Sequence, residues 1–194
     1  LAEKRYRTLV ENLPGAVYSS KLDARLTTSH MSTKVVDFTG YTSEEYLSGQ
    51  VTVLDLIHPE DLDQVNQQFN DAIRHKTPFR LVYRVITKAK EIRWLEDMGE
   101  LVKMEEGQDY VIGFWNDITE RVVAKQQLEK NLKLLEAIVE NSHSAIFVKD
   151  LDSKYIMVNR RWEIVTGHCR AEVIGKGWED FLNSEISDKY VHDD

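Results

Sequence analysis

Side chains that could carry catalysis or bind a metal are few in this sequence, and their spacing matches no familiar arrangement. His168-Cys169 has no further ligands at the spacing of a tetrahedral metal site. Ser29-His30 and Ser142-His143 lack a third residue that would complete a triad. Gly175-Lys176-Gly177 lacks the other glycines and the preceding strand of a phosphate-binding loop. We therefore expect no metal site and no enzyme activity within these residues.

Composition narrows the class of protein. The 194 residues are 42% hydrophobic and 30% charged, as in an ordinary globular chain that can bury a core. A net charge of −8 argues against a surface for nucleic acid or anionic membrane. The single cysteine fits a reducing compartment, and no apolar run approaches the about 20 residues of a membrane-spanning helix. We expect a cytoplasmic fragment of a longer protein, because neither Leu1 nor Asp194 looks like a natural end.

A long helix is expected to begin at Asp117-Ile118-Thr119-Glu120. Asp117 suits the N-cap, and Glu120 three residues later completes the capping-box pattern. No Gly or Pro interrupts the stretch to Asn141, and good helix formers dominate it. The sequence therefore predicts a linker helix over residues 118–141.

The residues before this helix have the pattern of one α+β domain, 1–117. Apolar positions at helical spacing predict an amphipathic helix over 1–13, and Pro59 with the carboxylates after it predicts the start of a helix to about His75. Strands are expected at 16–20, 26–31, 79–87, 91–103 and 110–116, and the last three form an antiparallel meander. Both faces of that meander are apolar, so we expect the middle helices on one and the N-terminal helix or a second subunit on the other.

An internal repeat organises the chain. Leu9-Val10-Glu11-Asn12 recurs as Ile138-Val139-Glu140-Asn141, an offset of 129 (138 − 9). Phe38-Thr39-Gly40-Tyr41 matches Val165-Thr166-Gly167-His168 at an offset of 127 (165 − 38). The second copy, 142–194, ends before the counterpart of the meander, so its sheet is expected to be incomplete unless another chain completes it.

These motifs resemble the PAS family of sensory domains. The resemblance in the first copy rests on motifs in family order, namely Pro14-Gly15-Ala16-Val17, Phe38-Thr39-Gly40-Tyr41, His58-Pro59-Glu60-Asp61, Arg93-Trp94-Leu95 and Asp117-Ile118-Thr119. The second copy resembles the first half of another PAS domain through Asn159-Arg160-Arg161, Thr166-Gly167 and Val173-Ile174-Gly175-Lys176. The family's fold is a five-stranded antiparallel sheet with helices on one face around a small cavity. One departure is Lys88-Ala89-Lys90, where the family usually has a glycine in the turn.

The resemblance implies a bacterial or archaeal sensor and bears on its cofactor. The light-sensing branch needs a cysteine shortly after Gly-Lys or Gly-Arg; Trp178 stands there in the second copy and 49–52 contains none, which excludes a cysteinyl-flavin adduct. Haem would need an axial ligand, and the one candidate on its helix, His75, is expected at the surface of the last turn. A non-covalent flavin, a small organic acid or no ligand at all stay open.

A candidate ligand cavity follows from matching strand order to the family. Its lining would be Val35, Val36, Phe69, Ile73, Tyr83, Val85, Leu95, Asp97 and Trp115. The alternative is that these residues fill a packed core. Asp97 favours a ligand, because a buried carboxylate is costly without a partner. Periodicity alone would instead turn Ile92, Trp94 and Met98 inward.

The expected function is a signalling module in which the first copy senses a small ligand or redox state. Asp117, Ile118, Thr119 and Glu120 would couple the last strand to the linker helix. Leu128, Leu132, Leu135 and Val139 lie at a/d spacing, which predicts a homodimer seam. The output domain would follow, most often a histidine kinase or diguanylate cyclase in this family. The rival hypothesis is a ligand-free module that only dimerises and spaces the output domain.

Overall fold

The structure, a computed structural model, describes residues 13–103, 107–178 and 180. The chain divides into two compact units, Leu1–Ala124 and Lys125–Asp194, and the division falls within helix α6 (Thr119–Glu140). Most of the predicted helix over 1–13 lies outside the described residues, as does the end of the second copy. Each unit is described below by itself.

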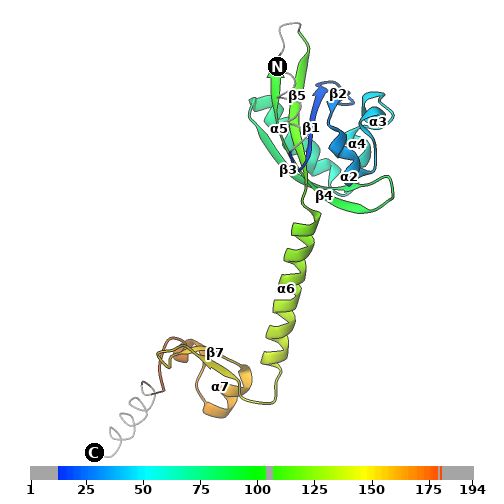
Figure 1. Ribbon diagram of the computed structural model, residues 1–194. Coiled ribbons are helices and arrows are strands. Elements are labelled where there is room, and N and C mark those ends of the chain that lie inside the picture. Colours follow the sequence, from blue (N-terminus) through cyan, green and yellow to red (C-terminus); the bar gives the residue numbers. More distant parts are fainter. Residues whose placement is uncertain (1–12, 104–106, 179, 181–194) are drawn as a thin grey trace, which may run out of the picture. The chain divides into compact units, whose positions relative to one another are not determined.

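The first unit contains a five-stranded antiparallel sheet in the order β2-β1-β5-β4-β3 (Figure 1). Its strands are β1 (Ala16–Lys21), β2 (Thr28–Met31), β3 (Phe79–Ile86), β4 (Ile92–Lys103) and β5 (Asp109–Asp117). Consecutive pairing of β3 with β4 and of β4 with β5 confirms the predicted meander. The α+β fold with a five-stranded antiparallel sheet is therefore as the sequence predicts.

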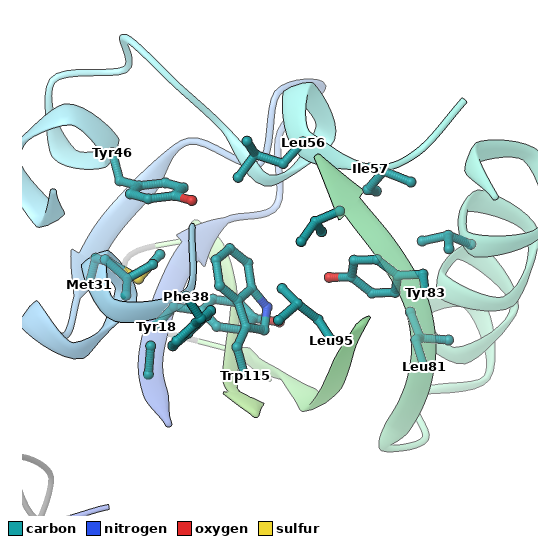
Figure 2. Close-up of a cluster of buried hydrophobic side chains, with 14 of the residues drawn as sticks. Tyr18, Met31, Phe38, Tyr46, Leu56, Ile57, Leu81, Tyr83, Leu95 and Trp115 are labelled. Carbon is teal, nitrogen blue, oxygen red and sulfur yellow. The ribbon is translucent and has the colours of Figure 1, made fainter. Parts of the chain in front are cut away.

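Helices connect β2 to β3 and cover one face of this sheet. They are η1 (Thr33–Val35), α2 (Val36–Thr39), α3 (Ser43–Leu47), α4 (Val53–Leu56) and α5 (Leu62–His75). Helix α3 begins with a capping box in which Thr42 and Glu45 each accept a backbone N–H of the other. Side chains from these helices and from the inner face of the sheet form one core (Figure 2).

The predicted start of α5 at Pro59 is wrong by three residues. The helix begins at Leu62, and the residues before it form a turn. The Asp61 carboxylate accepts the backbone N–H of Arg84 at 2.8 Å and also binds its guanidinium, while His58 N–H donates to Arg84 O at 2.8 Å. This ion pair lowers the pKa of Asp61. Contacts to β3 therefore hold the Asp61 carboxylate, whereas the sequence pattern predicted that it would interact with the positive end of the helix dipole.

The turn between β3 and β4 forms without glycine. Lys90 adopts the left-handed conformation, with φ of 66°, and its N–H donates to Thr87 O at 2.9 Å. The left-handed region costs a residue with a side chain roughly 1–2 kcal/mol. The flanking β3–β4 pairing maintains the turn despite that cost.

The second unit has the same order of elements as the beginning of the first. It pairs β6 (Phe147–Lys149) with β7 (Tyr155–Val158), followed by α7 (Arg160–Thr166) and α8 (Arg170–Val173). Gly40 and Gly167 close α2 and α7 with the same φ of 76°. Cys169 N–H donates to the Glu172 carboxylate at 3.2 Å, as Thr42 N–H does to Glu45 in the first unit. The repeat thus extends to the capping interactions, and Tyr155, Val158, Trp162 and Val173 form its core.

Candidate sensory core and helix junction

A buried carboxylate lies in the centre of the first unit. Asp97, on β4, accepts hydrogen bonds from the Tyr18 hydroxyl of β1 at 2.9 Å and from the Tyr83 hydroxyl of β3 at 3.0 Å. All three side chains are buried. The Tyr18 ring passes over Gly113 of β5, where an added Cβ would lie 2.6 Å from its atoms. Glycine at this position therefore allows Tyr18 to reach Asp97.

Burial controls the ionisation of this cluster. It raises the pKa of Asp97 to about 6, although the hydrogen bonds from Tyr18 and Tyr83 favour the charged form and oppose the shift. Burial and the nearby Asp97 charge together raise the pKa of both tyrosines. Asp97 is therefore the group in this core that titrates closest to neutral pH.

A small cavity of about 30 Å³ adjoins the carboxylate. Its lining is mostly apolar and comprises Tyr18, Ser20, Leu26, Val53, Leu54, Ile57, Val65, Asn66, Phe69, Leu81, Tyr83, Asp97 and Val111. Sites for organic ligands typically measure about 300–1,000 Å³. In this conformation the cavity accommodates a guest of the size of water, and a flavin would require core side chains to move.

The structure divides the predicted cavity residues into three groups. Phe69, Tyr83 and Asp97 line the cavity. The larger group is packed in the core around it, with Val35, Val85, Leu95 and Trp115 fully buried and Ile73 partly buried. Val36 is 41% exposed, so its assignment to the cavity is wrong. It follows Val35 in the chain, and successive helical residues point in different directions, so only one of the two can face the core.

The alternative orientation of β4 is not the one observed. Leu95 and Asp97 are buried on the inner face, whereas Ile92 is 52% exposed. Sequence reasoning missed Tyr18, Ser20 and Asn66 at the cavity. Tyr18 and Ser20 could have been found from the two-residue period of β1, since Ala16, Tyr18 and Ser20 are its buried positions.

Two hydrogen bonds tie the start of α6 to β4, and Asp117 at the end of β5 adds one contact to each of them. Ile118 N–H donates to Trp94 O, and Trp94 N–H donates to Thr119 Oγ1, both at 2.9 Å. Asp117 Oδ1 accepts the Thr119 N–H at 2.8 Å, and Asp117 Oδ2 pairs with Arg93 Nη1 at 3.0 Å. Ion pairing with Asp117 raises the pKa of Arg93. The start of α6 is thus held by hydrogen bonds to β4 as well as by its covalent connection to β5.

The predicted capping box at this junction is not the arrangement observed. The first helical hydrogen bond runs from Val122 N–H to Ile118 O, which puts Ile118 at the N-cap. Asp117 ends β5 and caps the first helical residue, Thr119, from one position earlier. Strand pairing to β4 extends to Asp117, which explains why the helix starts one residue later than the sequence pattern indicates.

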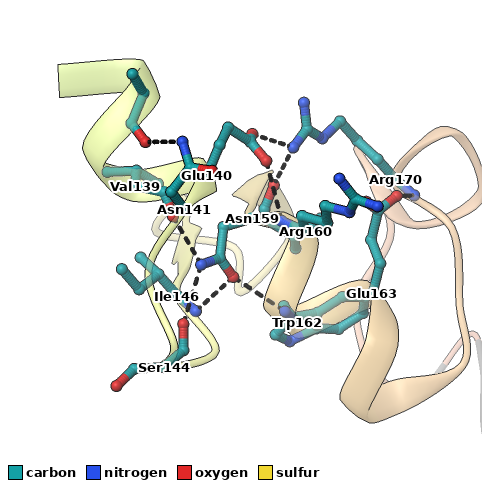
Figure 3. A network of polar contacts seen from close by, with 12 residues as sticks. Val139, Glu140, Asn141, Ser144, Ile146, Asn159, Arg160, Trp162, Glu163 and Arg170 are labelled. Carbon is teal, nitrogen blue, oxygen red and sulfur yellow. Dashed lines mark hydrogen bonds and ion pairs between the residues drawn. The ribbon is translucent and has the colours of Figure 1, made fainter. Parts of the chain in front are cut away.

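The end of α6 is held by the second unit (Figure 3). Asn159 is fully buried, and its Nδ2 donates to Val139 O at 2.8 Å and Ser144 O at 2.9 Å. Its Oδ1 accepts from Ile146 N–H at 2.8 Å and Trp162 N–H at 3.0 Å. Glu140, the last helical residue, pairs with Arg170. One asparagine thereby joins α6, the approach to β6, and α7.

The predicted seam along α6 is exposed. Leu128, Leu132 and Leu135 are 60%, 51% and 59% exposed, and Val139 is half-buried. Leu134, on another side of the helix, is equally exposed.

Among the described residues, no group of three or more His, Cys, Asp or Glu side chains is placed to hold a metal ion. None of the helices described has both the length and the apolarity needed to cross a membrane.

Two family models of the PAS fold match the chain, over residues 28–115 and 133–194. Among curated proteins, the two-component sensor PprA of Pseudomonas aeruginosa is 22% identical over 95% of this chain and 20% of its own length. The methyl sulfide methyltransferase-associated sensor of Methanosarcina acetivorans is 30% identical over 53% of this chain and 10% of its own. The chain thus spans a fifth or less of these two relatives.

Solved structures share the fold. A sensory box histidine kinase/response regulator from Burkholderia thailandensis superposes with a TM-score of 0.55 at 18% identity, covering 69% of this chain and 98% of that one. An RNA-binding light-oxygen-voltage receptor gives 0.57 at 20% identity, covering 69% and 38%. With PAS-fold models matching in tandem over both parts, this chain belongs to the PAS family.

Proposed function

We propose that this segment is a cytoplasmic relay in which the first PAS domain receives a signal in its core and passes it through α6 to an output domain of the longer protein. A histidine kinase is the favoured output, because the similar proteins include sensor kinases. A diguanylate cyclase is the other candidate. The segment itself is proposed to be non-catalytic, and the residues beyond α6 to form the first half of a second PAS domain.

The junction between β4 and α6 carries this proposal. Both backbone polar groups of Trp94 bind the helix start. Its C=O accepts the Ile118 N–H, and its N–H donates to Thr119 Oγ1. Displacement of β4 would therefore pull on the helix start through two hydrogen bonds. Sequence neighbours of Trp94 reach the core, since Leu95 is fully buried and Asp97 lies at the cavity.

Replacing Thr119 by Val tests the junction. The isosteric change removes the acceptor of the Trp94 N–H and is expected to cost about 1–2 kcal/mol locally. Amide exchange over residues 118–122 should accelerate by about 5- to 30-fold, the factor that such a cost implies. Thr119→Ser is the matched control and should exchange like the wild type. In the full-length protein, stimulus-dependent autophosphorylation should fall for Thr119→Val; regulation unchanged from wild type would rule out the relay.

The same proposal includes a homodimer formed along α6. The leucines at positions 128, 132 and 135 would pair with their counterparts, which the exposure of these side chains permits. Leu132→Asp would bury a charge in that seam and should raise the dimer dissociation constant on the order of 100-fold, about 2.7 kcal/mol. Leu134→Asp, an equally exposed site off the seam, is the control in analytical ultracentrifugation. Equal effects from the two variants would show that the seam is misplaced.

The small cavity favours a second candidate function, a ligand-free interaction module. With about 30 Å³ beside Asp97, the core provides packing more readily than a site for an organic ligand. Native mass spectrometry and an absorbance spectrum of the purified segment distinguish the two. A stoichiometric bound molecule, such as a flavin with its visible absorbance, would support ligand sensing. Mass and spectrum of the bare polypeptide would favour the interaction module.

A further inference from the structure

We propose that Asp97 is a proton-binding site, and that the first PAS domain takes the proton as its signal. The carboxylate would bind a proton when the pH falls and release it when the pH rises. Transmission of this change to α6 rests on the relay proposed above, whereas the proton site itself does not. A proton needs no large cavity, so the small space beside Asp97 is compatible with this ligand.

Among the residues that the structure describes, none supplies a cationic partner for the charge on Asp97. Of the residues lining its cavity, Tyr18 from β1 and Tyr83 from β3 are the other titratable groups, and α4, α5 and β5 contribute apolar side chains and the neutral Asn66. Tyr46 of α3 also contributes to the raised pKa of Tyr83. Arginines of the neighbouring strands are engaged elsewhere, since Arg80 pairs with Glu96, Arg84 with Asp61 and Arg93 with Asp117. Binding a proton is thus the way this site becomes neutral without moving a side chain to solvent.

Protonation changes the hydrogen bonds that join the strands. The ionised carboxylate accepts one bond from each tyrosine, Oδ1 from Tyr18 and Oδ2 from Tyr83. A carboxylic acid carries a proton on one oxygen, and that oxygen then donates. Where that proton points at a tyrosine, the tyrosine hydroxyl turns from donor to acceptor and needs a new acceptor for its own hydrogen. Ser20 and Asn66, which line the same cavity, are polar groups within this space.

The affected strands lead directly to the junction. Asp97 is paired with Trp115 across β4 and β5, and Leu95 with Asp117 in the same register. The Trp115 ring also contacts Tyr18, in a tilted arrangement with 5.0 Å between the ring centroids. Trp94 therefore lies three positions before Asp97 on β4, and Asp117, next to the start of α6, lies two positions after Trp115 on β5.

Titration of Asp97 itself is the first test. Its carboxyl carbon, followed by NMR in labelled protein and assigned by its loss in Asp97→Asn, should titrate near the pKa of about 6 that burial gives it. This corresponds to a proton affinity on the order of 100-fold above that of an exposed aspartate. A midpoint below 4.5 would overturn the proposal, because the group would then stay ionised at every physiological pH.

Stability against pH provides an independent readout. A carboxyl whose folded pKa is raised stabilises the fold most when protonated, and this contribution is lost as pH rises from about 4 through 6. Asp97→Asn resembles the protonated form, so it should denature at a higher urea concentration than wild type at pH 8, and the difference should disappear near pH 4. Glu100→Gln, on the outer face of the same strand, should track wild type throughout. A pH-independent difference for Asp97→Asn would contradict the proposal.

The last measurement separates the proton site from the relay. Amide exchange over residues 118–122 is compared at pH 5.5 and 7.5, with Asp97→Asn at each pH correcting for the intrinsic pH dependence of exchange. We expect an Asp97-dependent change of at least threefold. Titration near pH 6 without any such change would leave the proton site standing and overturn its connection to the relay. Thr119→Val should abolish the change at the helix without altering the titration.

Discussion

Replacing Asn159 by Ala is expected to unfold the second unit while the first remains intact. The substitution removes the cap of α7 and leaves Val139 O, Ser144 O and Ile146 N–H without the partner they have now. A lost cap costs about 1 kcal/mol, and each buried polar group left unsatisfied costs about 1–3 kcal/mol. Val139 O keeps the Ser142 N–H as a partner, so the cap and the two remaining groups together cost at least about 3 kcal/mol, which the small core described for this unit cannot tolerate.

Hydrogen exchange resolved by peptide measures this effect in each unit. Residues 144–176 should exchange at rates near those of an unfolded chain, whereas β1, β4 and β5 should keep their protection. Asn141→Ala is the matched control, because that side chain is exposed and its bond within the described part of the chain is to Ala137 O at 2.7 Å. Asn159→Asp retains the cap acceptor but loses both donated bonds, so it should fall between the two. Retained protection of residues 144–176 in Asn159→Ala would show that the network is not essential.

Structural features that the local sequence determines could be predicted. The meander followed from alternating side chains between short turns, and the long helix from an uninterrupted run of helix formers. The repeat was visible because Gly40 and Gly167 serve the same left-handed position at the ends of α2 and α7. In each case one residue type or one period determines the local conformation.

Features that depend on tertiary contacts were not readable. The Asp61 carboxylate suits a helix start by type, yet Arg84, more than 20 residues away, binds it and shortens α5. Asp117 and Glu120 have the spacing of a capping box, but pairing of β5 with β4 displaces the helix start. The size of the cavity depends on how Tyr18, Tyr83 and Leu81 interdigitate, and no periodicity contains that information.

The candidate site likewise has one part that could be predicted from the sequence and another that depends on tertiary contacts. Asp97 was singled out because a carboxylate on an inward face is unusual, and that reasoning needs no partner. Its two tyrosines come from strands 79 and 14 residues away in the chain, and only the sheet order brings them together. The sequence therefore identified the charged group, whereas the fold was needed to show that two hydroxyl donors, and no cation from the described part of the chain, contact it.

Gly113→Ala, a change on the neighbouring strand β5, is expected to disrupt this site. An added Cβ would lie 2.6 Å from the Tyr18 hydroxyl and ring, so the ring must move, and its hydrogen bond to Asp97 is lost. Overpacking of a core costs about 1–3 kcal/mol, and a hydrogen bond to a charged group contributes about 1.5–3 kcal/mol. We expect the free energy of unfolding to fall by about 3–5 kcal/mol. The pKa of Asp97 should also rise further, since one of the bonds that oppose the shift disappears.

A double-mutant cycle in urea denaturation shows whether Tyr18 is the residue displaced. Tyr18→Leu shortens the side chain and removes the atoms that the new methyl group would meet, so adding Gly113→Ala to it should cost less than 1.5 kcal/mol. Gly49→Ala is a comparison without overpacking: an added Cβ there meets no atom within 4 Å, so only its φ of 73° carries a cost, of about 1–2 kcal/mol. Additive costs at Gly113 and Tyr18 would mean that the ring is not held against β5. In that event Asp97 would have to be stabilised by Tyr83 alone, and the link from β4 to β1 through the carboxylate would be lost.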